Sequence, residues 1–271
     1  MAGPQDPLQG VPDLQGEPGA GGAALKKKLA EQEETLGVDH EETLRTVNAI
    51  GVRLHTQGKL KEAELFFRCA LEGRERTLEC FHPDTLVSVG NLGSLLYGQG
   101  KLDLAEPFFR CDLEGCELVQ GRDHPDTLSS VGNLGSLLQA QGKLSLAEPY
   151  CRRALEGRER TLGNDHPHTL GTVNSLGVLL KEQGKLGLAE PFLRRALEGR
   201  ERVRGRDHPD TLLSVNNLGG LLQAQGKLSL AEPYFRRALE GRERTLGPEH
   251  PDTLVSVVSL RVLLKALKKE K

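Results

Sequence analysis

Apolar residues recur at spacings of three and four along most of the chain, which is the pattern of a helix that buries one face. In residues 124–165, one such stripe begins at Leu128 and a second at Ala147. The triplet that begins at Gln141 separates them, and its glycine predicts a left-handed helix cap. Two helices joined by a short glycine turn form an antiparallel helical hairpin.

The start of each predicted helix carries its own signal. Pro125 suits the first position of the first helix, where its missing N–H is not needed. Ser145 to Glu148 predicts a capping box for the second helix. Because proline is tolerated only near the start of a helix, Pro149 predicts that the second helix begins no earlier than Ser145.

This hairpin recurs along the chain at a constant period of 42 residues. A histidine marks the period, at His40, His82, His124, His166, His208 and His250. A fixed period of this size is typical of a solenoid, in which each unit buries its apolar face against its neighbours. We therefore expect an all-α solenoid of antiparallel helix pairs.

The repeat divides the chain into a tail and one solenoid. Residues 1–22 are rich in glycine and proline and have no hydrophobic period, so we predict a disordered tail. The solenoid is predicted over residues 23–271. Its parts are a half repeat at 23–39, whole repeats at 40–81, 82–123, 124–165, 166–207 and 208–249, and a terminal helix at 250–271.

Glycine occurs inside the predicted helices, although each one costs roughly 1 kcal/mol against alanine. Gly93 on the first helix and Ala105 on the second recur with the repeat. We expect these small residues to face each other and let paired helices approach closely. Glycines late in the second helix, such as Gly115, have no equally good explanation in the sequence.

Charge, hydropathy and cysteine usage exclude several classes of protein. The formal net charge is −2, so no global field attracts nucleic acid or an anionic membrane. No apolar run approaches the roughly 20 residues of a membrane span, and no secretory signal is visible. The 5 cysteines include no CxxC motif, so neither a disulfide framework nor a zinc site is predicted. We expect a cytoplasmic protein with reduced thiols, no metal and no cofactor.

The elements NLGxLLxxQGKL and AExxxRRALExRERxLGxDHPDTL resemble tetratricopeptide repeats. The 42-residue unit with its LGxDHP corner is similar to the repeats of kinesin light chains and nephrocystin-like proteins. The resemblance extends over about residues 24–271. It implies a right-handed superhelical solenoid whose concave face is lined by the first helices and holds peptide ligands.

The resemblance also indicates which side chains would line that face. They are polar residues on the first helices, near the position two residues before the small glycine. The predicted peptide-binding residues are Asn48, Asn91, Asn133, Asn174, Asn216, Asn217, Ser94, Ser136, Tyr97, Gln139, Lys181 and Gln223. An asparagine amide offers two donors and an acceptor, so it can hold a peptide backbone of almost any sequence. The alternative is that these asparagines merely bridge neighbouring helices.

Charged side chains are scarce beside this row. Only Arg45 and Lys181 lie near it, and they are far apart in the sequence. A C-terminal carboxylate ligand is therefore not favoured, and an acidic peptide has weak support. The arginine and glutamate run that includes Arg152, Glu156 and Arg158 is interpreted as a solvated outer face with i, i+4 ion pairs.

The remaining candidates for chemistry are weak. Histidines on successive repeats should lie about 10 Å apart, too far to share one metal ion, so each is expected to hydrogen-bond at the start of its helix. Cys111, Cys116 and His124 could form a cysteine–histidine nucleophile pair, but a degenerate repeat that replaced arginine with cysteine explains them better. That repeat, 82–123, is a candidate contact patch.

We expect a scaffold or adaptor that binds peptide segments of partner proteins and is not an enzyme. One alternative is a cargo adaptor like a kinesin light chain, and another is a structural or oligomerising spacer without a peptide ligand. Self-association through the last helix is part of the second alternative. Its apolar side chains Val255, Val258, Val262 and Leu263 would be open on one side.

Overall fold

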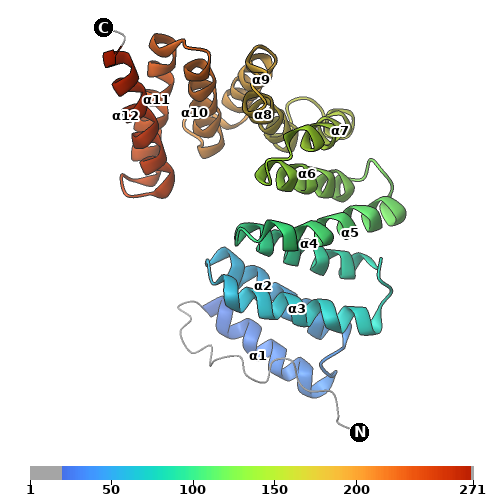
Figure 1. Cartoon of the computed structure of the whole chain (residues 1–271). Helices are drawn as coiled ribbons and strands as arrows, with labels where there is room; N and C mark the ends of the chain where they lie inside the picture. The colour runs from blue at the N-terminus through green and yellow to red at the C-terminus, as the bar shows by residue number, and fades with distance from the viewer. Residues whose placement is uncertain (1–19, 270–271) are drawn as a thin grey trace. The chain divides into compact units, whose positions relative to one another are not determined.

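The computed structural model describes residues 20–269, which form helices and no strand. The helices, drawn in Figure 1, are α1 (Ala20–Thr35), α2 (Glu41–Thr56), α3 (Leu60–Thr77), α4 (Pro83–Gly98), α5 (Leu102–Gln120), α6 (Pro125–Ala140), α7 (Leu144–Leu162), α8 (Pro167–Glu182), α9 (Leu186–Arg204), α10 (Pro209–Ala224), α11 (Leu228–Leu246) and α12 (Pro251–Lys269). The expected all-α class is confirmed. The predicted disordered tail lies outside the described residues, except that residues 20–22 belong to α1.

The helices of the described residues divide into two compact units, with the boundary after Ala140. The first unit holds α1 to α6, and the second holds α7 to α12. Within each unit, every helix packs against the next along the chain. Two kinds of contact alternate: a hairpin contact inside a repeat, as between α4 and α5, and a joint between repeats, as between α5 and α6.

The histidine that marks each repeat caps a first helix. Nδ1 of His82 accepts a hydrogen bond of 3.2 Å from the N–H of Asp84, and His40, His124, His166, His208 and His250 do the same in their own repeats. Proline then occupies the first helical position, as at Pro83. Both predictions for this corner are confirmed.

The predicted start of the second helix is wrong by one residue. α7 begins at Leu144, and its N-cap residue Lys143 makes no side-chain capping bond, so the expected capping box at Ser145 does not form. Pro149 therefore lies inside the helix, where it removes one backbone hydrogen bond. Pro107, Pro191 and Pro233 occupy the same place in α5, α9 and α11.

The glycines within the helices mark the closest helix contacts. A Cβ atom at Gly93 of α4 would lie 3.0 Å from the ring of Phe109, so the small residue faces a large side chain rather than Ala105. The glycine late in the second helix now has an explanation. A Cβ at Gly199 of α9 would overlap the Leu170 side chain of α8, because the two helices of the hairpin touch there.

A glutamate on the second helix links neighbouring repeats at the surface. Glu148 of α7 accepts hydrogen bonds from Arg152 at 2.9 Å and from Lys185, the residue before α9, at 2.8 Å. These hydrogen bonds lower the pKa of Glu148 to about 2. Glu64 is bonded in the same way to Arg68 and Lys101, so the link recurs in both units.

The apolar face of α12 is only partly as predicted. Val255, Val258 and Val262 are exposed, as expected. Leu263 is fully buried, because it occupies the position of the buried Leu221 one repeat earlier, and its prediction as an open residue is wrong.

Two glycine substitutions in α9 test the close packing of each hairpin. Gly199→Ala and Gly187→Ala both gain helix propensity, but only the first places a methyl group against another side chain, since nothing lies within 4 Å of a Cβ at Gly187. Overpacking should make the Gly199→Ala protein about 1–3 kcal/mol less stable than the Gly187→Ala protein. Urea denaturation of both variants measures this difference, and equal stability would contradict the packing described.

Candidate functional site

The predicted peptide-binding residues all lie on the first helices of the hairpins. In the first unit they are Asn48 on α2, Asn91, Ser94 and Tyr97 on α4, and Asn133, Ser136 and Gln139 on α6. In the second unit they are Asn174 and Lys181 on α8, and Asn216, Asn217 and Gln223 on α10. The repeat therefore places them on equivalent turns within each unit.

Four of the asparagines bridge neighbouring first helices. Asn91 donates a hydrogen bond of 3.0 Å to Oδ1 of Asn48, and Asn217 donates one of 3.1 Å to Oδ1 of Asn174. Asn174 is only 6% exposed, so it serves this bridge rather than a ligand. Asparagines that bridge neighbouring helices, the alternative to peptide binding, are thus present in both units.

Several members of the row are more accessible than Asn174. Asn133 is exposed, and Ser94, Ser136, Gln139 and Lys181 are half-buried, as are Asn216, Gln223 and the bridging Asn217. Tyr97 is 37% exposed and its ring lies 6.4 Å from that of Phe109. The accessible part of the row is polar and carries one cation, Lys181, among the twelve predicted residues.

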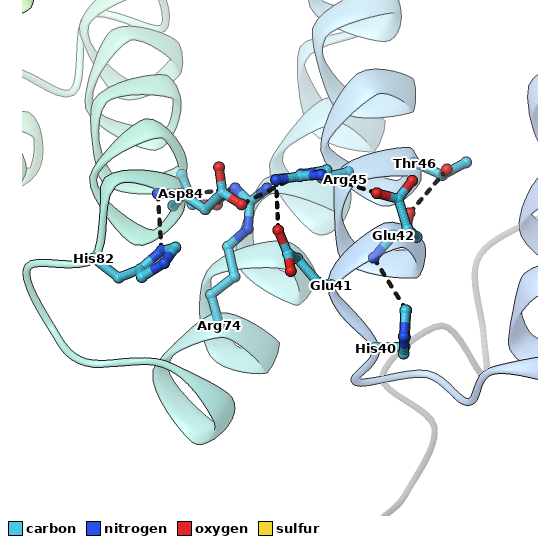
Figure 2. A network of polar contacts seen from close by, with 9 residues as sticks. His40, Glu41, Glu42, Arg45, Thr46, Arg74, His82 and Asp84 are labelled. Carbon is cyan, nitrogen blue, oxygen red and sulfur yellow. Dashed lines mark hydrogen bonds and ion pairs between the residues drawn. The ribbon is translucent and has the colours of Figure 1, made fainter.

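Arg45 is not available to an acidic peptide as the sequence suggested. Figure 2 shows its guanidinium between Glu41, Glu42 and Asp84. The ion-pair distances are 2.5 Å to Glu41, 2.9 Å to Glu42 and 3.4 Å to Asp84. Three carboxylates around one guanidinium leave no net positive charge at this place.

A buried arginine closes the joint between one repeat and the next. Arg74 of α3 lies beneath the start of α4 (Figure 2), and its Nη1 donates to the backbone oxygen of Asp84 and to Oγ of Ser88, both at 2.7 Å. Arg200 makes the equivalent bonds to Asp210 and Ser214, both at 2.8 Å. Burial lowers the pKa of both arginines.

The prediction that Arg158 lies on a solvated outer face is wrong. Arg158 is half-buried and donates a hydrogen bond of 2.6 Å to the hydroxyl of Thr172. The available signal was a spacing, because each of these arginines precedes a serine or threonine of the next first helix by the same interval. The pairs are Arg74 with Ser88, Arg158 with Thr172, Arg200 with Ser214, and Arg242 with Ser256.

The joint between α5 and α6 departs from this pattern. Cys116 stands at the arginine position and Asp112 stands where the other repeats have alanine. The Asp112 side chain is buried and accepts a 2.6 Å hydrogen bond from the Ser130 hydroxyl. A pocket of about 230 Å³ opens beside them, lined by Pro83, Leu86, Val87, Gly90, Asn91, Ser94, Asp112, Cys116, Gln120, Asp126, Ser129, Ser130 and Asn133.

The cysteines near this pocket are poor nucleophiles. Burial raises the pKa of Cys116 to about 11, so its thiol is protonated near neutral pH. His124 uses Nδ1 to cap α6 and, within residues 20–269, forms no hydrogen bond with the thiol of Cys111 or Cys116. The contacts favour the degenerate repeat over a cysteine–histidine nucleophile pair.

Neither a metal cluster nor a membrane span is found between residues 20 and 269. No group of three histidine, cysteine or carboxylate side chains in this part of the chain is arranged to hold a metal ion. The helices described there are also too short or too polar to cross a bilayer.

Comparison with known proteins gives one family. A family model described as tetratricopeptide repeat matches residues 84–150, 126–202, 172–244 and 210–260, and a second model of that description matches residues 43–84. No curated protein matches the chain.

Several solved structures share the fold. Nearly identical TPR-like repeats assigned to a kinesin light chain of Podosopora anserina are 21% identical, with a TM-score of 0.65 over 76% of this chain and 98% of that one. BtubC of P. vanneervenii is 22% identical, with a TM-score of 0.68 over 85% of this chain and 92% of that one. A Rap protein complexed with Competence and Sporulation Factor is 14% identical, with a TM-score of 0.61 over 92% of this chain and 70% of that one.

Two arginine substitutions in α9 test the buried joint. Arg200→Met leaves the Asp210 carbonyl without its donor in a buried place, which should cost about 1–3 kcal/mol of unfolding free energy. Arg202→Met removes an exposed ion pair with Asp165, which should cost less than about 1 kcal/mol. Urea denaturation measures the unfolding free energy of both variants. Equal losses of unfolding free energy would show that the buried joint contributes no more to stability than the exposed ion pair.

Proposed function

Because the chain belongs to the tetratricopeptide repeat family, we propose that it is a scaffold that binds segments of partner proteins and catalyses no reaction. One observation carries the proposal. Asn91, Ser94 and Asn133, three of the residues predicted to bind peptide, line a single pocket at the joint between successive repeats. A hollow edged by amides and hydroxyls is suited to the backbone of an extended peptide.

The charges of the described surface support a protein ligand over nucleic acid. Arginines on the second helices are paired along their own helix, as Arg110 is with Glu106 at 2.7 Å and Arg194 with Glu190 at 2.7 Å. Binding to a phosphate backbone requires cations that are not already neutralised. The Rap protein of similar fold is complexed with Competence and Sporulation Factor, which is consistent with a ligand held by such repeats.

We propose a cytoplasmic location from the cysteine pattern of the sequence alone. The likeness to kinesin light chain repeats is one of fold. The function is therefore proposed from the polar surface, and a cargo-adaptor role would be a narrower form of the same activity.

An array of overlapping synthetic peptides tests the proposal. The variant Asn91→Ala/Asn133→Ala/Asn217→Ala removes amides from both units. Its affinity for the captured peptides should be about tenfold or more below that of the wild type, because two or more hydrogen bonds are lost. A matched variant with three substitutions on second helices, Arg110→Ala/Arg152→Ala/Arg194→Ala, should bind as the wild type does. Circular dichroism confirms that both variants are folded.

Unchanged affinities in the folded asparagine variant would contradict a binding role for this surface. The same is true if the arginine variant loses the peptides equally. Capture of no peptide by the wild-type chain would also count against the proposal.

An oligomerising array is a second candidate, favoured by the exposed face of α12. Val255, Val258 and Val262 are each more than half exposed, at 53%, 60% and 51%. A hollow of about 530 Å³ lies between α11 and α12, lined by Leu239, Val257, Leu260, Arg261, Leu264, Lys265 and Lys268. Adjacent exposed apolar side chains are typical of a protein contact.

Light scattering during size-exclusion chromatography tests this candidate. If α12 mediates self-association, the wild-type mass should rise with concentration, and Val255→Ser/Val258→Ser/Val262→Ser should remain monomeric. Substituting exposed valines elsewhere, as in Val87→Ser/Val119→Ser/Val203→Ser, should leave the association unchanged. A wild-type chain that is monomeric at every concentration would rule out the array.

A further inference from the structure

The joint between α5 and α6 keeps the acceptors found at four other joints but not the arginine that binds to them there. At the joint between α3 and α4, the Arg74 guanidinium satisfies the carbonyl of Asp84 and the hydroxyl of Ser88. The equivalent residues of α6 are Asp126 and Ser130, and the residue facing them on α5 is Cys116. The cysteine side chain is shorter than that of arginine, and its thiol is a weak hydrogen-bond donor.

Four further differences distinguish this joint from the preceding one, of which one adds a carboxylate and two shorten a side chain. Asp112 replaces alanine and adds a carboxylate, while Gln120 replaces the leucine found at Leu78. Val87 occupies the position of Arg45, which pairs with Asp84 in the preceding repeat. Asp126 is equivalent to Asp84 and therefore has no arginine partner at this position. Gly90 replaces an asparagine, and even a Cβ at this position would lie only 3.5 Å from Oδ1 of Asp112.

The carboxylate of Asp112 has no cationic partner among residues 20–269. Asp112 is 7% exposed, and its partners are the Ser130 hydroxyl at 2.6 Å and the weak thiol donor of Cys116 at 3.7 Å. Burial raises the pKa of Asp112, and the neighbouring Asp126 raises it further. A buried carboxylate is stable when a positive group pairs with it and costly when none does.

A second acceptor at the pocket has no hydrogen-bond donor at all. Oε1 of Gln120 is buried and forms no hydrogen bond, while the amide nitrogen of Gln120 donates to Asp126 at 3.3 Å. The pocket therefore presents acceptors from Asp112, Gln120 and Asp126, with the Ser130 hydroxyl between them. Pro83, Leu86 and Val87 form an apolar part of the wall.

We propose that this pocket binds the side chain of an arginine from a partner protein, in the place that the repeat's own arginine occupies at four other joints. That the arginine arrives on a protein segment rests on the proposed scaffold function. The guanidinium would pair with Asp112 and donate to Gln120 and to the acceptors at the start of α6. Its methylene stem would lie along the apolar part of the wall.

The chemistry of the pocket favours arginine over other ligands. An anion would be repelled by Asp112 and Asp126. A lysine ammonium could pair with one carboxylate, but it has three donors on one atom, whereas a guanidinium has five in a planar fork that can reach several acceptors. In Arg74, Arg200 and Arg242, Nη1 alone donates to both the carbonyl and the hydroxyl, so a guanidinium in this place keeps its other nitrogens for further acceptors.

A small probe tests the pocket independently of any peptide groove. Nα-acetyl-L-arginine methylamide, titrated into the ¹⁵N-labelled full chain, should shift the amide resonances of α5 and α6 around Asp112 and Ser130. The isosteric but uncharged Nα-acetyl-L-citrulline methylamide should bind at least about tenfold more weakly, because it lacks the charge-assisted bonds. The affinity of the corresponding lysine probe, Nα-acetyl-L-lysine methylamide, should lie between those of the arginine and citrulline probes.

Two variants complete the test. Asp112→Asn removes the negative charge and should lower the affinity for the arginine probe by about tenfold or more. Asp112→Ala/Cys116→Arg restores the residues of the other repeats, so this protein should fold, unfold at a higher urea concentration than wild type, and fail to bind the probe. Equal binding of the arginine and citrulline probes, or of the arginine probe to all three proteins, would overturn the proposal.

The outcome separates this proposal from the scaffold function. If the arginine probe binds as described but the asparagine substitutions do not affect peptide capture, the pocket stands and the peptide surface fails. If captured peptides depend on the asparagines but tolerate citrulline in place of arginine, the peptide surface stands and the pocket proposal fails.

Discussion

The fold depends on how the second helix of one repeat is joined to the first helix of the next. Apolar burial brings the two helices together, but it also covers a backbone carbonyl and a hydroxyl at the start of the first helix. In four joints a guanidinium reaches these acceptors from the helix before, as Arg242 reaches Asp252 at 2.9 Å and Ser256 at 2.8 Å. An unpaired buried acceptor costs about 1–3 kcal/mol, so this contact stabilises each of the four joints that have it.

The same constraint explains why one repeat can carry function while its neighbours carry structure. Where the arginine is present, the protein satisfies these acceptors with its own side chain. Where Cys116 and Asp112 replace the usual pair, the acceptors remain and a buried carboxylate is added, and this joint opens beside Asn91 and Asn133. The substitutions that weaken the repeat as a structural unit therefore supply a ligand site on the surface expected to bind peptide.

The sequence predicted those parts of the fold that depend on local signals. The repeat period, the histidine caps and the first-helix starts follow from the neighbouring residues, and each is found. The buried arginine could not be predicted in the same way, because Arg158 is surrounded in sequence by exposed Arg and Glu, and its partner Thr172 lies in the next helix. The asparagine row was located on the right helices, but its bridges between repeats depend on side-chain directions that the sequence does not give. The pocket could be predicted only by knowing both where the repeat arginine lies and which residues replace it at the joint between α5 and α6.

The most direct measurement is a crystal structure of the Asp112→Ala/Cys116→Arg protein. If the pocket is the place of the repeat arginine, the new guanidinium will occupy it and donate to the Asp126 carbonyl and the Ser130 hydroxyl at the distances seen for Arg74, with α5 and α6 unmoved. An arginine that instead points into solvent, with the pocket still open, would contradict the account.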